Sequence, residues 1–431
     1  MKVLRAGVCL LVAFSVLAHG VVEVWSESVL EIAAALLFLS WAFVIVRTKE
    51  SKVEWNGLLW AVAGLLAWPL VQLALRITVY PFLTWTGILR WGAIALIFFV
   101  STQVFRERQD YRMLTWFFVV LGFAVGLEGI IQYYTSTESI YWVRRLSAGR
   151  PFGPYVNRNH FAGLMELLVP VGVSFLAFRG ARRDMVPLVG LLTLVPIGAI
   201  FLSASRGGIV AFLFEMGILA TLFVFRRSRS VKIVPLAAFL LLGIAVAGWL
   251  GATRAVGRFL PNQPGEATVA RRLTMFRAAT HIFLAHPLTG TGLGTLINVF
   301  PRFELDYDGK VVDHAHNDYI ETLADLGLPG GLLGLAFLWV LFKKGTEALG
   351  SDQNQSHFSF AFHAAALTAC TGLLIHGLVD FNFQIPSNAL IFLIQAGLGV
   401  SPPLVQEVVV RKNRRSSMQH STVDTGVLAR P

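Results

Sequence analysis

Long apolar stretches separated by short polar segments occupy most of the chain. A membrane-spanning helix needs about 20 mostly apolar residues, and on that scale the pattern predicts twelve spans. They cover approximately residues 6–23, 29–46, 57–75, 85–105, 113–134, 161–178, 185–203, 207–225, 233–250, 328–342, 358–378 and 387–405. The pattern therefore predicts an all-α polytopic membrane protein in which residues 1–405 form a single transmembrane domain.

The composition supports this fold class. Of the 431 residues, 55% are hydrophobic and only 14% are charged, whereas soluble domains carry about 25% charged residues. The cysteines, Cys9 and Cys370, both lie inside apolar runs. We therefore expect no disulfide framework and no zinc framework.

The basic residues alternate between predicted loops. They occur at the N-terminus and then in every second loop and in the polar tail 406–431, as Lys2/Arg5, Arg47/Lys49/Lys52, Arg106/Arg108/Arg112, Arg179/Arg182/Arg183, Arg226/Arg227/Arg229/Lys232, Lys343/Lys344 and Arg411/Lys412/Arg414/Arg415. With twelve spans, all of them fall on one side, and the positive-inside rule makes that side the cytoplasm. Both termini are then cytoplasmic, and the tail is expected to be disordered. The net charge of +11 needs no nucleic-acid partner.

Two predicted outer loops, about 135–160 and 251–315, are also basic. They contain Arg144, Arg145, Arg150 and Arg158 in the first, and Arg254, Arg258, Arg271, Arg272, Arg277 and Arg302 in the second. Long outer loops can cross the membrane regardless of charge, so the topology permits these arginines without explaining them. An anionic ligand would explain them.

The second loop has predicted structure of its own. Residues 268–285 fit an amphipathic helix at the membrane surface, with Leu273, Phe276, Ala279 and Phe283 on one face. Gly290-Thr-Gly-Leu-Gly294 lacks the strand and spacing of a dinucleotide-binding loop, so we interpret it as a tight turn between surface helices.

The densest cluster of chemistry lies at residues 313–321. His314 and His316 stand among Asp313, Asp318 and Glu321, and the Asp318/Glu321 spacing predicts a capping box that begins a helix at 318. A metal site would need a further ligand that the spacing does not supply. A structural histidine at a helix start remains an alternative. We favour a general base, because histidine titrates near neutral pH.

Polar residues next to other spans extend the candidate site. Arg206 lies between two apolar runs, where an arginine either serves a site or extends its charge to the interface. Asn157, Asn159 and His160 follow Arg150 and could bind a sugar or cap the next helix. Asp380, in the last outer loop, could approach the histidines as an orienting partner or be an ordinary loop acid.

Taken together, several motifs resemble those of the O-antigen ligase and polymerase family over about residues 140–330. They are Arg150-Pro-Phe-Gly, Asn159-His-Phe-Ala, Ser205-Arg206-Gly207, Arg272-Leu-Thr-Met-Phe276, His286-Pro-Leu-Thr-Gly-Thr-Gly-Leu-Gly294 and His314-Ala-His316-Asn317-Asp318-Tyr319. The resemblance implies a GT-C-like membrane glycosyltransferase of the bacterial inner membrane. Such an enzyme takes a glycan from an undecaprenyl-diphosphate carrier on the periplasmic side and passes it to an acceptor hydroxyl, classically on lipid A-core, without a cofactor or metal.

The resemblance also implies roles for individual residues. Arg206, Arg272 and Arg150 match diphosphate-binding arginines, and His316 matches the family's histidine before Asn317. His314 is a second candidate base, because this sequence has two histidines. Asn159, Asn317, Asp318 and Asp380 would be supporting residues, and direct displacement would invert the anomeric carbon.

Other functions remain open at this point. A repeat-unit polymerase would use a second carrier-linked glycan as acceptor, and a protein O-oligosaccharyltransferase would use Ser or Thr. A polysaccharide or lipid transporter should show two related halves with interrupted helices, and we find no such symmetry. A non-catalytic scaffold would not need Arg206 or the histidine pair.

Overall fold

The computed structural model describes residues 1–48, 53–136, 139–145, 150–226, 269–304, 307, 309–350 and 356–402. Its α-helices are α1 (Lys2–Leu17), α2 (Val24–Thr48), α3 (Gly57–Ala74), α4 (Pro81–Val104), α5 (Arg108–Thr135), α6 (Arg158–Ala177), α7 (Val186–Ser203), α8 (Arg206–Phe225), α10 (Val269–Ala285), α11 (Leu296–Val299), α12 (Asp318–Gly350), α13 (His357–His376) and α14 (Pro386–Gly399). Short 3-10 turns lie at Arg183–Met185, Phe300–Arg302 and Asn382–Gln384. In the first basic loop, β1 (Ser139–Ile140) and β2 (Arg144–Arg145) form a small antiparallel hairpin that the sequence did not predict.

The helices confirm the predicted polytopic class. Every predicted span coincides with a helix except 233–250, which lies outside the described residues, as does the predicted tail 406–431. Within the described ranges, nine helices are long and apolar enough to cross a membrane. The helices at the first and last predicted spans, α1 and α14, have only 16 and 14 residues.

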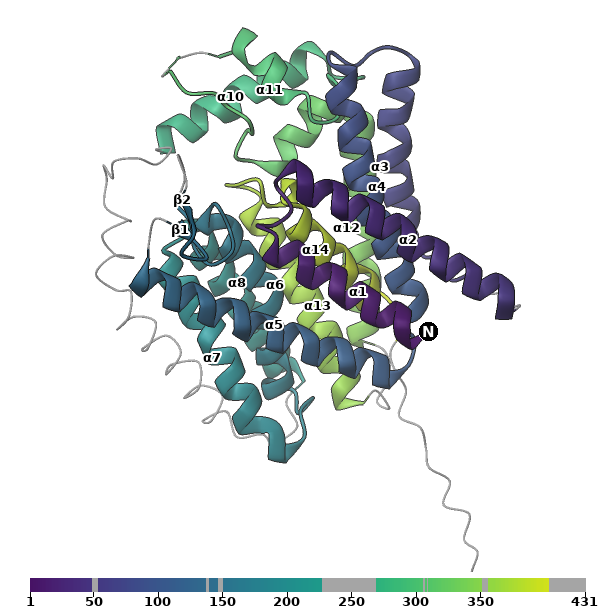
Figure 1. Cartoon of the computed structure of the whole chain (residues 1–431), viewed down its shortest axis with the longest axis vertical. Helices are drawn as coiled ribbons and strands as arrows, with labels where there is room; N and C mark the ends of the chain where they lie inside the picture. The colour runs from purple at the N-terminus through teal and green to yellow at the C-terminus, as the bar shows by residue number, and fades with distance from the viewer. Residues whose placement is uncertain are drawn as a thin grey trace, which may run out of the picture.

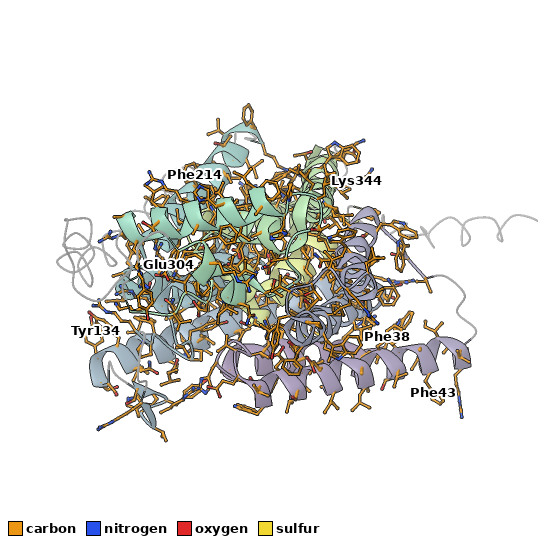
Figure 2. All side chains as sticks on the ribbon, turned by 90° about the horizontal axis from the view of Figure 1, so that it is seen from above. Phe38, Phe43, Tyr134, Phe214, Glu304 and Lys344 are labelled. Atoms are coloured by element: carbon orange, nitrogen blue, oxygen red, sulfur yellow. The ribbon has the colours of Figure 1, made fainter. Side chains whose placement is uncertain are left out.

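The outside of the helical bundle is apolar. Phe43, Tyr134 and Phe214, labelled in Figure 2, are 60%, 60% and 56% exposed. Further large apolar side chains are exposed along α2, α3 and α12. A continuous surface of this kind is unfavourable in water and suits contact with lipid, so the chain is a multi-pass membrane protein.

The centre of the bundle is formed by α6 and α13, which are buried along nearly their whole length. These two helices pack against one another, and both also contact α8 and α14. Figure 1 shows α6, α8 and α13 in the middle of the molecule, with α10 and α11 at one end. The polar residues that α6, α8 and α13 carry are therefore held in a rigid, water-poor setting.

The outer helix α10 confirms the predicted element, and half of its predicted face, Ala279 and Phe283, packs into the outer cluster. The side chains buried against α11 and α12 are Met275, Ala278, Ala279 and Ile282, whereas Leu273 and Phe276 are 45% and 40% exposed. Both sets have helical spacing, so the sequence pattern allowed either stripe. Packing against α12 selects the one at i, i+3, i+4 and i+7.

The glycine turn is confirmed as a turn between α10 and α11, and it also lies against α12. Gly290, Gly292 and Gly294 all have positive φ, at 65°, 114° and 75°. The N–H of Gly292 donates to the carbonyl of Asp325 at 2.9 Å, just before α12 breaks at Gly327, where φ is also 65°. The turn thereby fixes the outer helices to the break in α12.

Replacing Gly290 by alanine should destabilise this attachment. The new Cβ would lie 2.2 Å from the carbonyl oxygen of Asp325 at a positive φ, so the backbone must move. We expect the free energy of unfolding in detergent to fall by about 2 kcal/mol or more. As control, Gly334→Ala, in α12 with no atom within 4 Å of the new Cβ, should be neutral or slightly stabilising; equal losses in both variants would contradict this account.

Candidate functional site

Several segments that are distant in sequence converge on the carboxylate of Asp380, which is 0% exposed. Asn159 Nδ2 donates to its Oδ2 at 2.6 Å, and His316 Nδ1 lies 3.2 Å from its Oδ1. Arg272 Nη2 lies 3.5 Å from Oδ2, and His160 Nε2 lies 3.9 Å from Oδ1. The structure thus joins α6, α10 and the start of α12 through one acidic side chain.

The charge of Asp380 determines which ring nitrogen of His316 carries the proton they share. Burial alone would raise the pKa of this carboxyl, but the hydrogen bond from His316 and the nearby guanidinium of Arg272 hold it well below its usual range. An ionised carboxylate only accepts hydrogen bonds. The proton between the two side chains is therefore on His316 Nδ1, so a neutral ring would carry its lone pair on Nε2.

The backbone turn at His316 brings its ring to this carboxylate. His316 has φ of 49°, in the left-handed region that histidine adopts more readily than most residues. Its ring meets Phe381 edge-on, with centroids 4.8 Å apart at 74°. Phe381 also contacts the rings of His160 and His314, so one aromatic ring packs against all three histidines of the site.

The predicted start of a helix at 318 is confirmed, but the predicted capping box is wrong. The cap is Asn317, whose side-chain oxygen accepts the N–H groups of Tyr319 and Ile320, both at 3.0 Å. Asn317 Nδ2 also donates to the carbonyl of Leu378 at 2.8 Å. An amide can serve both functions because it donates and accepts, whereas a carboxylate cannot.

Asp318 is instead bound to the segment that carries Asp380. Its Oδ2 accepts the N–H of Phe383 at 3.2 Å, and its own N–H donates to the carbonyl of Gly377 at 2.9 Å. Together with Asn317, it fixes the first turn of α12 to residues 377–383. The distance between His316 and Asp380 is therefore set by backbone contacts on both sides.

His314 has a different partner from His316. Its Nδ1 lies 2.6 Å from Glu321 Oε1, and its ring stacks on Phe381 at 4.3 Å and 24°. Burial lowers the pKa of His314, but the charge and hydrogen bond of Glu321 raise it more, so the net shift is upward. The two neighbouring histidines therefore point to different carboxylates and do not converge on one point.

Across the described ranges, no three His, Cys, Asp or Glu side chains meet where they could hold a metal ion.

Arg206 is the first residue of α8. Ala204, with φ of 53°, ends α7, and the Ser205 side chain caps α8 by accepting the N–H of Gly208. Arg206 Nε is buried without a hydrogen-bond partner. A guanidinium at a helix N-terminus is a suitable anion contact, because the helix dipole adds positive potential there.

The start of α8 lies directly against residues 376–379. A Cβ on Gly207 would lie 2.5 Å from His376 Nε2 and 3.2 Å from Val379 Cγ2. The carbonyl of Val379 in turn accepts a hydrogen bond from Arg272 Nη1 at 2.6 Å. Arg206 and Arg272 are thus placed on either side of one short segment.

Arg150 is not brought to this centre. It is exposed, and its carbonyl accepts the N–H of Arg158 at 3.0 Å, which orders the turn before α6. Within the part of the chain that the structure describes, its side chain is not among the contacts of Asp380. Asn157 caps α6 through the N–H of Asn159, which leaves the Asn159 amide to bind Asp380.

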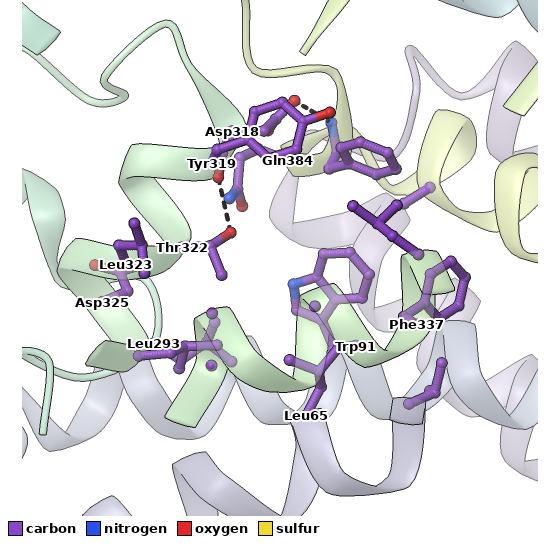
Figure 3. A pocket seen from close by; sticks show the side chains of 18 of the residues that line it. Leu65, Trp91, Leu293, Asp318, Tyr319, Thr322, Leu323, Asp325, Phe337 and Gln384 are labelled. Carbon is purple, nitrogen blue, oxygen red and sulfur yellow. Dashed lines mark hydrogen bonds between the residues drawn. The ribbon is translucent and has the colours of Figure 1, made fainter. Parts of the chain in front are cut away.

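A cavity of about 400 Å³ lies between α3, α4, α12 and α14, with mostly apolar walls. Figure 3 shows Asp318 and Gln384 at its upper end and Leu65 and Leu293 at its lower end. Asp318 belongs to the first turn of α12, next to His316. The cavity is therefore suited to an apolar chain whose polar end lies near the histidines.

The sequence analysis missed the buried pair His376–Glu166, whose Nδ1 and Oε1 are 2.8 Å apart. A signal was present, because Glu166 and Glu215 are acidic residues inside predicted spans. Ionisable residues within spans usually have a functional role. His376 also precedes Asp380 by one helical turn in the same motif.

The depressed pKa of Asp380 predicts a pH-dependent contribution to stability. The pKa of Asp380 in the folded protein lies below the unfolded value of about 3.9. Its contribution to the free energy of unfolding is therefore present above about pH 4 and is lost as the pH falls from there toward the folded pKa. Asp380→Asn should lower the free energy of unfolding by about 3 kcal/mol at pH 7, and the difference from wild type should shrink below about pH 4. Denaturant unfolding at several pH values would measure this difference.

The exposed pair Arg182–Asp184 supplies a control, since Asp184→Asn should change the free energy of unfolding little at any pH. An effect of Asp380→Asn that does not depend on pH would contradict the prediction.

Comparison with known proteins gives one family. The family model described as O-Antigen ligase matches residues 190–335. This stretch contains Arg206, Arg272, His314 and His316, whereas Asp380 lies outside it. No curated protein matches the chain. The match confirms, over the segment that carries the arginines and the histidine pair, the resemblance of this multi-pass membrane protein to the O-antigen ligase family.

Proposed function

We propose that this chain transfers a glycan from an undecaprenyl-diphosphate carrier to an acceptor hydroxyl. The matched family suggests a membrane glycosyltransferase of the O-antigen ligase or polymerase type. The observation that supports a transfer reaction most directly is the Asp380 centre, where one buried carboxylate binds both His316 and Arg272. In the proposed step, the base and one cation would share this support.

His316 is the proposed general base. Asp380 accepts from Nδ1, so the neutral ring presents a lone pair at Nε2, as a base requires. His314 is the weaker candidate, because it pairs with Glu321 rather than with Asp380, the carboxylate that also binds Arg272.

Arg206 and Arg272 are the proposed diphosphate contacts, and Arg150 remains a further candidate at the exposed turn. In the proposed step, the acceptor oxygen bonds to the anomeric carbon while the bond from that carbon to the phosphate oxygen breaks. The diphosphate leaves with the electron pair, and His316 takes the hydroxyl proton. Guanidinium groups stabilise the developing charge because they stay protonated and bind phosphate in a bidentate manner.

This displacement would invert the anomeric carbon, and the proposal includes no metal and no cofactor. Asn159, Asn317 and Asp318 support it by holding Asp380 and the first turn of α12 in place. We place the reaction at the periplasmic face of a bacterial inner membrane, with both termini in the cytoplasm, on the pattern of basic loops. Lipid A-core is the proposed acceptor; a carrier-linked glycan, as in a polymerase, or a protein hydroxyl are the alternatives.

The two histidines can be separated by substitution. His316→Ala should lower kcat roughly 10²- to 10⁴-fold, because the base is lost, while the KM for the lipid-linked donor changes little. His314→Ala leaves the His316–Asp380 contact in place and should lower kcat by less than about tenfold. Transfer assays with purified protein would measure both. A larger loss from His314→Ala than from His316→Ala would move the base to His314.

The reaction itself is tested by supplying an undecaprenyl-diphosphate-linked glycan to the purified protein with one acceptor at a time. Lipid A-core, a second carrier-linked glycan and a Ser/Thr-containing peptide separate the ligase, polymerase and protein-glycosylating activities. We expect product with lipid A-core, an inverted anomeric linkage, and the same rate in excess EDTA. Absence of product with every acceptor would reject the glycosyltransferase, and a rate lost in EDTA and restored by added metal would reject the metal-free step.

A further inference from the structure

A buried histidine–carboxylate pair lies directly behind the first turn of α8. His376 Nδ1 is 2.8 Å from Glu166 Oε1, and the two side chains are 1% and 0% exposed. Glu166 lies on α6, His376 ends α13, and Gly207 of α8 packs onto His376 Nε2. The proposed transfer step does not use this pair, although it joins three central helices at the edge of the site.

The charges of the pair can be assigned from its surroundings. A lone carboxylate in the interior of a membrane protein is very unfavourable without a cation. His376 is the hydrogen-bond partner of Glu166, so an ionised Glu166 is compensated by an imidazolium at His376. Glu215, on α8, is 0% exposed, and neither of its oxygens has a hydrogen-bond partner. It interacts electrostatically with Glu166, and with one cation for two carboxyl groups Glu215 is expected to be uncharged.

The free side of the His376 ring lies against the first turn of α8, at Gly207. With Nδ1 bound to Glu166, His376 Nε2 has no hydrogen-bond partner and lies against Gly207. Arg206 Nε and Arg272 Nε are also buried without partners. Arg272 and Asp380 both act electrostatically on His376. The three unpartnered nitrogens thus belong to residues that lie in, beside or against the 376–380 segment: His376 within it, Arg272 bonded to Val379, and Arg206 next to Gly207.

We propose that Glu166 holds His376 as an imidazolium that supplies a third fixed positive charge, beside Arg206 and Arg272, for a diphosphate bound at the N-terminus of α8. The inference rests on the proposed function and adds a residue to its donor site. His376 acts as a charge-supplying and positioning residue. Gly207 is required because any side chain there would displace the imidazole from the turn.

The full-length protein in detergent tests this with inorganic pyrophosphate as the probe. Glu166→Gln keeps an oxygen that accepts from His376 Nδ1 but removes the charge that keeps the ring protonated. His376→Gln removes the cation itself. Both should weaken pyrophosphate binding roughly ten- to thirtyfold, as expected for loss of one nearby charge. Both should also raise the KM for the lipid-linked donor and leave the KM for the acceptor unchanged.

Glu215→Gln is the matched control, because it makes the same chemical change in the same buried region. An uncharged Glu215 should be replaced with less than about a twofold change in pyrophosphate affinity. Thermal unfolding of each variant separates loss of affinity from loss of fold, and His376→Gln carries the test if Glu166→Gln does not fold.

The outcomes separate this inference from the proposed function. If Arg206→Ala abolishes pyrophosphate binding while Glu166→Gln and His376→Gln bind like wild type, the inference is wrong and the diphosphate site stands. Equal losses in Glu166→Gln and Glu215→Gln would make the region structural and overturn the inference. If wild type binds no pyrophosphate and Arg206→Ala transfers glycan at full rate, the proposed diphosphate site falls as well.

Discussion

The site depends on keeping one carboxylate ionised where there is almost no water. Asp380 is completely buried, and its charge persists only because Asn159, His316 and Arg272 all provide donors to it. Each of these comes from a different part of the chain, and removing any one of them leaves the buried carboxylate of Asp380 less well compensated. The same contacts fix the tautomer of His316 and hold Arg272 at the edge of the site. The need to compensate the charge of Asp380 thus determines where the other side chains of the site lie.

The surrounding helices make this arrangement rigid. The buried helices α6 and α13 carry Asn159 and His376, and the first turn of α12 is bound to residues 377–383 by Asn317 and Asp318. Close approach of α8 to α13 needs the missing side chain at Gly207. Preorganisation of this kind lowers the cost of stabilising charge during a reaction, because the dipoles and charges are already in place.

Much of the fold could be predicted from the sequence, because hydrophobic stretches of span length leave few alternatives. The choice of face on α10 could not, since two stripes of equal period exist and only contact with α12 selects Met275 and Ile282. Arg206, Arg272 and the histidines could be identified as candidates from their unusual positions. Their partners could not, because the pairing of His316 with Asp380 and of His314 with Glu321 depends on how distant segments meet. Local spacing similarly favoured Asp318 as the cap, and tertiary contacts gave that position to Asn317.

The break in α12 at Gly327 divides the helix into two parts with different contacts. The short part from Asp318 to Leu326 is attached to the glycine turn and to the Asp380 segment, while the part after the break runs on through the bundle to Gly350. Spans respond to a thicker or thinner bilayer mainly by tilting. The break lets the longer part follow the bundle at its own angle, while the short part keeps the direction that its contacts with residues 377–383 require.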